Sequence, residues 1–113
     1  VRLYDPGYPP YRDLPTGRYD AVICTDVLEH IPEEDLGWVV AEILGFADKF
    51  VYLAIACYPA TKTLPTGENA HLTQRPPGWW IDLVHGIQRE SFPDVTVYLS
   101  IEDAGHRKVL TEL

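Results

Sequence analysis

Two apolar segments of strand length, joined by one amphipathic helix, constrain the fold of this chain more than any other feature. Residues 19–24 and 50–57 are near-continuous apolar runs, which are typical of strands covered on both faces. Between them, apolar residues recur at helical spacing from Leu36 to Ala47, after the acidic helix start at 32–35. This order predicts a parallel βαβ unit in which the segments around 20–24 and 51–57 lie side by side.

The remaining segments extend this unit into a mixed sheet. Residues 1–5 alternate between apolar and polar and predict a short strand that ends at Asp5. A second helix is expected after Pro76-Pro77, a strand at 95–101, and its hairpin partner at 108–113 after a turn at 104–106. We therefore predict one α/β domain over residues 1–113, with a mostly parallel sheet, flanking helices and an antiparallel C-terminal hairpin.

Composition excludes several classes of protein. The 113 residues carry a net charge of −8, which argues against nucleic acid and anionic membrane surfaces as partners. No run of about 18 apolar residues could span a membrane, and no N-terminal segment is typical of a signal peptide. Two cysteines are too few for a disulfide framework, so we expect a reducing, cytoplasmic setting. The chain has no methionine and begins at Val1, which suggests a processed chain, a fragment or an incomplete sequence.

Polar residues gather where the predicted strands end. Because ligands bind beyond the carboxyl ends of strands in open α/β sheets, these residues mark the candidate site. They are Asp5, then Cys24, Thr25 and Asp26, then Cys57 and Tyr58, followed on the 58–75 loop by Glu68, Asn69 and His71. The sequence thus predicts a polar rim at one edge of the sheet.

The segment 19–31, YDAVICTDVLEHI, resembles the fourth strand and following turn of class I S-adenosylmethionine-dependent methyltransferases. The family pattern there is FDxVxxxxVLEHI, and the resemblance is strong over residues 19–57. It implies a Rossmann-like fold and S-adenosyl-L-methionine as the cofactor. In the same resemblance, residues 1–5 correspond to the second family strand and the final hairpin to the last two strands.

The resemblance also assigns cofactor contacts. Asp5 would hold the ribose hydroxyls, because a carboxylate can accept two hydrogen bonds from a diol. Two alternatives stay open for it: residues 1–5 are the third family strand, or the acid only caps a turn. Contacts on the methionine side of the cofactor would come from Cys24, Thr25, Asp26, Glu29 and His30. For Glu29 and His30 the alternative is a turn whose histidine packs under the next helix.

One departure from the family is serious. The family's glycine-rich first loop has no counterpart, because no G-x-G pattern occurs in the chain, and the first strand and helix are also missing. The missing strand would lie in the middle of the sheet and leave two apolar edges exposed. We therefore expect a C-terminal part of a longer protein, a second copy or partner covering the gap, or a differently closed fold. We also expect the chain alone to bind S-adenosylmethionine weakly or not at all.

The 58–75 loop is longer than a crossover needs, which suggests a lid or substrate wall. Asn69 and His71 are the candidate catalytic residues, with His71 as general base; the alternative is that the loop bonds only to itself. Candidate substrate contacts are Tyr58, Glu68, Trp79 and Trp80. Adjacent helical residues point about 100° apart, so only one of the two tryptophans is expected in the core.

The two cysteines are interpreted as buried free thiols. A metal site that joins them to His30 or His71 has no supporting C-x-x-C or H-x₃-H spacing, so no metal is predicted. The leading function is methyl transfer to a small-molecule, sugar or protein acceptor. The alternative is a non-catalytic binding or assembly module that kept the fold, and a metal-dependent hydrolase has the least support.

Overall fold

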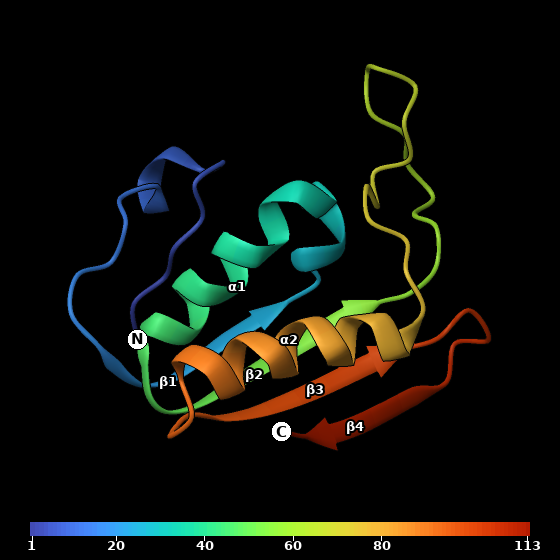
Figure 1. Ribbon diagram of the computed structural model, residues 1–113. Coiled ribbons are helices and arrows are strands. Elements are labelled where there is room, and N and C mark those ends of the chain that lie inside the picture. The colour runs from blue at the N-terminus through green and yellow to red at the C-terminus, as the bar shows by residue number, and fades with distance from the viewer.

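The computed structural model describes residues 1–113 and contains one four-stranded sheet with the strand order β1-β2-β3-β4. The strands are β1 (Tyr19–Thr25), β2 (Ala47–Ala56), β3 (Thr96–Glu102) and β4 (Lys108–Glu112), and the helices are α1 (Leu36–Gly45) and α2 (Pro77–Ser91). Three short 3₁₀ turns, η1 (Pro9–Tyr11), η2 (Leu28–His30) and η3 (Glu33–Asp35), lie between them. Figure 1 shows this arrangement.

The strand pairing confirms the predicted topology. β1 pairs with β2 and β2 pairs with β3 in parallel, while β4 runs antiparallel to β3. Val22 lies opposite Val51, and Leu53 lies opposite Leu99, so apolar side chains stack across the parallel strands. The predicted βαβ unit and the C-terminal hairpin are therefore both present.

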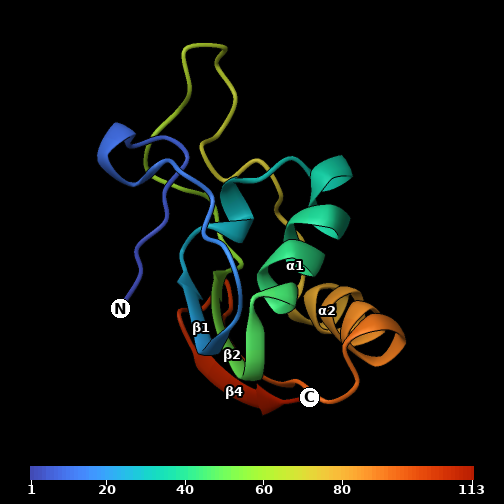
Figure 2. The same cartoon turned by 90° about the vertical axis from the view of Figure 1, so that its left-hand side faces the viewer.

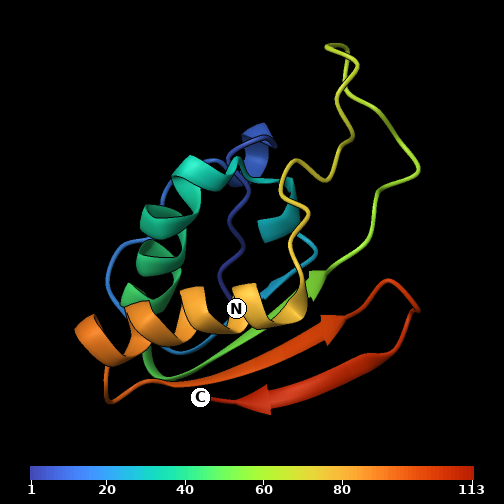
Figure 3. The same cartoon turned by 45° about the vertical axis from the view of Figure 1, so that its right-hand side comes forward.

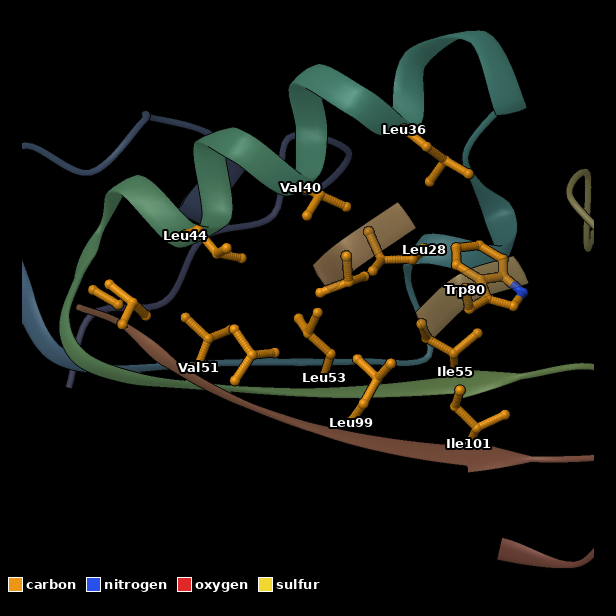
Figure 4. Packing of buried hydrophobic residues seen from close by; sticks show 14 residues of the cluster. Leu28, Leu36, Val40, Leu44, Val51, Leu53, Ile55, Trp80, Leu99 and Ile101 are labelled. Atoms are coloured by element: carbon orange, nitrogen blue, oxygen red, sulfur yellow. The ribbon is translucent and has the colours of Figure 1, made fainter. Parts of the chain in front are cut away.

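Both helices cover the same face of the sheet (Figures 1 and 2). On α1, the fully buried residues Leu36, Val40 and Leu44 recur every four positions and face β2 (Figure 4). On β2, every second residue from Val51 to Ile55 is buried against them. The resulting cluster of 14 buried residues forms the core between the helices and the sheet.

The opposite face of the sheet carries no helix. Ile23 is 71% exposed and Leu110 is 66% exposed on this face, and the ring of Phe50 lies 6.0 Å from that of Tyr98. β1 is an edge strand, because its only neighbour is β2. None of the helices is both long enough and apolar enough to cross a membrane.

The predicted strand at residues 1–5 is wrong. These residues form no strand and leave the free edge of β1 unpaired, because their end at Asp5 is folded into a turn before Pro6. The Asp5 carboxylate instead accepts a hydrogen bond from the backbone N–H of Gly7 at 2.9 Å, and its backbone N–H donates to the Tyr11 carbonyl. Asp5 therefore caps a turn, which was the alternative for this residue, and no gap opens inside the sheet.

The boundary between α1 and β2 also differs from expectation, since α1 ends at Gly45. β2 begins at Ala47, because Asp48 and Lys49 extend the strand rather than end the helix. Arg18, before β1, pairs with Asp48 at 2.6 Å and donates to the Ala47 carbonyl, which ties the start of β2 to the chain entering β1.

The 58–75 loop carries no helix or named strand and extends beyond the sheet at the same end as the turn between β3 and β4 (Figure 3).

Candidate functional site

The site begins where β1 ends. Asp26 adopts a positive φ of 57°, an uncommon backbone conformation for a residue other than glycine, and this turns the chain sharply out of the sheet. The η2 turn follows at once, with Leu28 buried in the core beside Trp80 (Figure 4). Because Leu28 anchors the turn, the next two side chains, Glu29 and His30, are held at the carboxyl edge of the sheet.

Three hydrogen bonds attach the 58–75 loop to this turn. The Nδ1–H of His30 donates to the Ala70 carbonyl at 2.9 Å. Thr73 donates twice, from its backbone N–H to the Glu29 carbonyl at 3.1 Å and from its hydroxyl to the Ile31 carbonyl at 2.7 Å. Thr73 is 2% exposed, so these bonds are shielded from water. The loop is therefore fixed on the turn at residues 70–73, although it has no regular secondary structure there.

Asn69 shapes the loop from within. Its side-chain oxygen accepts hydrogen bonds from the backbone N–H groups of Ala60 and His71, both at 2.9 Å, and its NH₂ donates to the Ala60 carbonyl at 2.9 Å. This is the self-bonded arrangement that was the alternative to a catalytic role. All three hydrogen bonds of the amide go to the loop backbone, so in this structure Asn69 positions His71.

His71 lies where the sequence predicted it, at the carboxyl edge on the side of Asp26 and His30. Its side chain is buried, with 8% exposure, and its ring packs edge-on against the His30 ring with centroids 4.7 Å apart. Its Nδ1–H donates to the carbonyl of Tyr58. Because a carbonyl oxygen only accepts, this bond assigns the proton to Nδ1 in the neutral ring and leaves a free lone pair on Nε2. The bond from His30 to Ala70 assigns the same tautomer to His30.

The Glu29 carboxylate is the most unusual group of the site. The residue is 0% exposed, and neither carboxylate oxygen has a hydrogen-bond partner. Burial raises the pKa of Glu29 and Asp26 raises it further, while its own backbone N–H and the imidazoles of His30 and His71 lower it. The ligand atoms of Glu29, His30 and His71 all lie within 4.8 Å of one another. Two imidazoles and one buried carboxylate thus converge on a single point.

A cleft of about 470 Å³ opens beside these three residues, and its size suits a small molecule. Its floor is the helix-free face of β2 and β3, with Tyr52, Ala54 and Ser100 among the lining residues. Across the cleft, the Tyr58 hydroxyl donates to Glu102 at 3.3 Å. Burial raises the pKa of Tyr58, and the negative charge of Glu102 raises it further.

Among the residues that line or border this cleft and that sequence reasoning missed, three polar ones lie at or after the end of β3. Glu102 and Lys108 line the cleft, and His106 contacts Glu102 through Nδ1 at 3.2 Å. The signal was present in the alternation of β3, which places Glu102 at the carboxyl end of the strand on the face opposite the core. Glu102 was not predicted because the candidate site was placed only at the ends of the strands that precede β3.

The two thiols are unsuited to ionic chemistry. Burial raises the pKa of Cys24 to about 11, with added effects of Glu29 and Asp26. Burial likewise raises the pKa of Cys57 to about 11, with added effects of Glu29 and Asp103. Because the thiolate is the metal ligand and nucleophile, both cysteines are weak candidates for either role.

The other predicted site residues are spread more widely. Trp80 is fully buried in the core, whereas Trp79 is half-buried with the Arg75 guanidinium 5.5 Å from its ring. Glu68 lies far along the 58–75 loop and contacts the Thr66 hydroxyl at 3.2 Å. Thr25 is exposed at the end of β1. Neither tryptophan lines the cleft; one is in the core, as expected for adjacent helical residues.

A comparison with known proteins gives one partial match. A stretch of 41 residues is 42% identical to the chloroplastic magnesium protoporphyrin IX methyltransferase of Arabidopsis thaliana. The match covers 36% of this chain and 13% of that protein's length, so the similarity is confined to a short segment. No family model and no solved structure matches the chain. Together with the mixed sheet, which is consistent with a Rossmann-like fold, the match makes this segment methyltransferase-like.

Proposed function

We propose that this chain provides the acceptor side of an S-adenosylmethionine-dependent methyltransferase that acts on a small molecule. The observation that carries the proposal is the 41-residue match to a methyltransferase, at 42% identity. The mixed parallel sheet supports it, because such sheets bind ligands beyond the carboxyl ends of their strands. The cleft reaches that edge at Asp26, Glu29 and His71, and its volume of about 470 Å³ favours a small-molecule acceptor over a polymer.

The chemistry follows from the geometry of the rim. Methyl transfer is an in-line displacement, in which the acceptor oxygen or nitrogen attacks the methyl carbon and the sulfonium sulfur leaves, so orientation supplies much of the acceleration. A hydroxyl acceptor must also lose its proton. The free Nε2 lone pair of His71 can take this proton, because Nδ1 is already committed to Tyr58. Asn69 and Thr73 then act as positioning residues that hold the imidazole in place.

Cofactor binding is the direct test. Backbone amide resonances of the ¹⁵N-labelled chain would be followed during titration with S-adenosylmethionine, because this method detects millimolar affinity. We expect weak binding with shifts confined to residues 25–31 and 57–61, since the chain has no G-x-G loop to contact the cofactor. Shifts spread over the helices, or sub-micromolar binding, would contradict the proposal.

The absence of a G-x-G pattern favours one alternative, a non-catalytic module that kept the fold and binds a ligand in the same cleft. The two functions separate in an assay with methyl-labelled S-adenosylmethionine and a panel of small hydroxyl and amine acceptors. Transfer of label to any acceptor supports the methyltransferase. Cofactor-independent binding of a panel member in the cleft, with no transfer, supports the module.

A further inference from the structure

We propose that Glu29, His30 and His71 form a binding site for one divalent transition-metal ion at the edge of the cleft. The ligand atoms of the three side chains lie within 4.8 Å of one another, although the sequence separates His30 from His71 by the whole of α1 and β2. The assignment of a role to this metal rests on the proposed function, but metal binding itself does not.

The first line of argument is the orientation of the two imidazoles. In metal sites, a histidine that binds through one nitrogen usually donates its other ring N–H to a carbonyl or carboxylate, which fixes the ring and its tautomer. His30 donates from Nδ1 to the Ala70 carbonyl, and His71 donates from Nδ1 to the Tyr58 carbonyl. Both rings are therefore held with Nε2 free to bind a metal ion.

The second, independent line is the Glu29 carboxylate. The side chain is fully buried, and both oxygens lack a hydrogen-bond donor. Leaving such a group ionised without compensation is costly, so buried charges are paired or coordinate metals. Only its own backbone N–H acts on the carboxylate, and no side chain donates a hydrogen bond to either oxygen. A cation held between the carboxylate and the two imidazoles supplies the compensation.

The donor set selects the class of metal. Two imidazole nitrogens and one carboxylate oxygen suit Zn²⁺ and its neighbours, whereas Mg²⁺ prefers oxygen ligands and retains water. At bond lengths of about 2.1 Å, tetrahedral ligands lie about 3.4 Å apart, so the ligands must approach by up to about 1.4 Å on binding. His30 is the exposed ligand of the three, so its side chain can adjust without disturbing the core. Three protein ligands leave a coordination position open toward the cleft, as in catalytic zinc sites.

Metal binding would also change the chemistry of the rim. The metal uses the Nε2 lone pair of His71, so this nitrogen no longer accepts a proton from the acceptor. An acceptor oxygen in the open position would instead be activated by the metal, which lowers the pKa of a bound hydroxyl or water. The deprotonated oxygen then attacks the methyl group, and its proton leaves to solvent.

The test is a titration of the chelator-treated chain with ZnCl₂ by calorimetry, and with CoCl₂ by visible absorption. We expect one ion per chain and cobalt bands typical of a site with fewer than six ligands, with no competition from MgCl₂. Glu29→Gln and His30→Ala should each weaken binding at least tenfold, since even outer-shell partners are worth about 10–100-fold. His30 is exposed, so His30→Ala preserves the fold if the buried Glu29→Gln does not.

Two matched controls lie outside the site. Glu34→Gln and His85→Ala remove one exposed acid and one exposed imidazole elsewhere, and both should leave the affinity unchanged. The inference is overturned if no stoichiometric ion binds, if Glu29→Gln leaves the affinity unchanged, or if His85→Ala weakens binding as much as His30→Ala does. Neither cofactor nor acceptor enters the titration, so a negative result here is distinct from a failure to bind S-adenosylmethionine.

Discussion

Replacing Glu29 by glutamine should stabilise the metal-free chain at neutral pH, which is the reverse of the usual result for a buried polar residue. The side chain is 0% exposed and neither oxygen has a donor, so the ionised carboxylate destabilises the folded state. An unsatisfied buried group costs about 1–3 kcal/mol, and a charged one costs more. Glutamine keeps the shape and retains the cost of a neutral amide. We therefore expect a net gain of about 1–2 kcal/mol.

The pH dependence identifies the cause of this gain. The pKa of folded Glu29 is raised by burial, so the folded state holds the proton more tightly than the unfolded chain does. Below the unfolded pKa of about 4.3, both states are protonated and no penalty exists. As the pH rises toward the folded pKa, the wild-type chain loses about 1.4 kcal/mol per unit by which the two pKa values differ. The advantage of Glu29→Gln should be absent near pH 4 and should grow as the pH rises from the unfolded pKa toward the folded pKa.

Urea unfolding in the presence of EDTA at several pH values measures this difference. In a thermal unfolding experiment, a gain of 1 kcal/mol corresponds to an increase of roughly 4 °C in Tm for a domain of this size. Added ZnCl₂ should reverse the order, because a ligand at 100 times its Kd stabilises the wild type by about 2.7 kcal/mol and the variant far less. A loss of stability at pH 8, or a gain that is the same at pH 4, would show that Glu29 is already compensated and would refute this reasoning.

Three further predictions address the loop, the helix and the proposed reaction. Thr73→Val keeps the branched shape but leaves the Ile31 carbonyl without its 2.7 Å donor, so the free energy of unfolding in urea should fall by about 1–2 kcal/mol. Trp80→Ala should lower it by about 3–5 kcal/mol, whereas Trp79→Ala should cost clearly less; equal losses would contradict their different burial. Once an acceptor is known, His71→Ala should reduce kcat at least tenfold, with the affinity for S-adenosylmethionine little changed; unaffected turnover would remove His71 from the reaction.

The sheet was predictable because its strands carry their own signal. The apolar runs that became β1 and β2 are joined by a helix of clear periodicity, as predicted. The expectation that both faces of these strands are covered was wrong, because the helices pack on one face only and Ile23 is exposed on the other. Residues 1–5 show the limit of the same method. Their alternation is as regular as that of a strand, but a strand requires a partner, and the sequence does not state whether β1 offers its free edge to this segment.

The candidate site was predictable only by position. Strand direction placed Asp26, His30 and His71 at one edge, because the ends of parallel strands meet there. The role of Glu29 was not accessible in this way, since an acid in a turn is normally exposed and nothing in the local sequence shows that it is fully buried. Its convergence with His71 depends on the path of the 58–75 loop, which carries no periodic pattern.

The side-chain donors around this site are used by the loop backbone, which explains why the Glu29 carboxylate receives no hydrogen bond from them. Thr73, Asn69 and both imidazole Nδ1–H groups use their donors on backbone carbonyls, and together they hold residues 70–73 against η2. The chain thus stabilises the positions of three ligand groups and leaves the Glu29 carboxylate without a side-chain donor. Such an arrangement is stable only with a proton or a cation at the centre, and the pH profile and zinc response of Glu29→Gln distinguish the two.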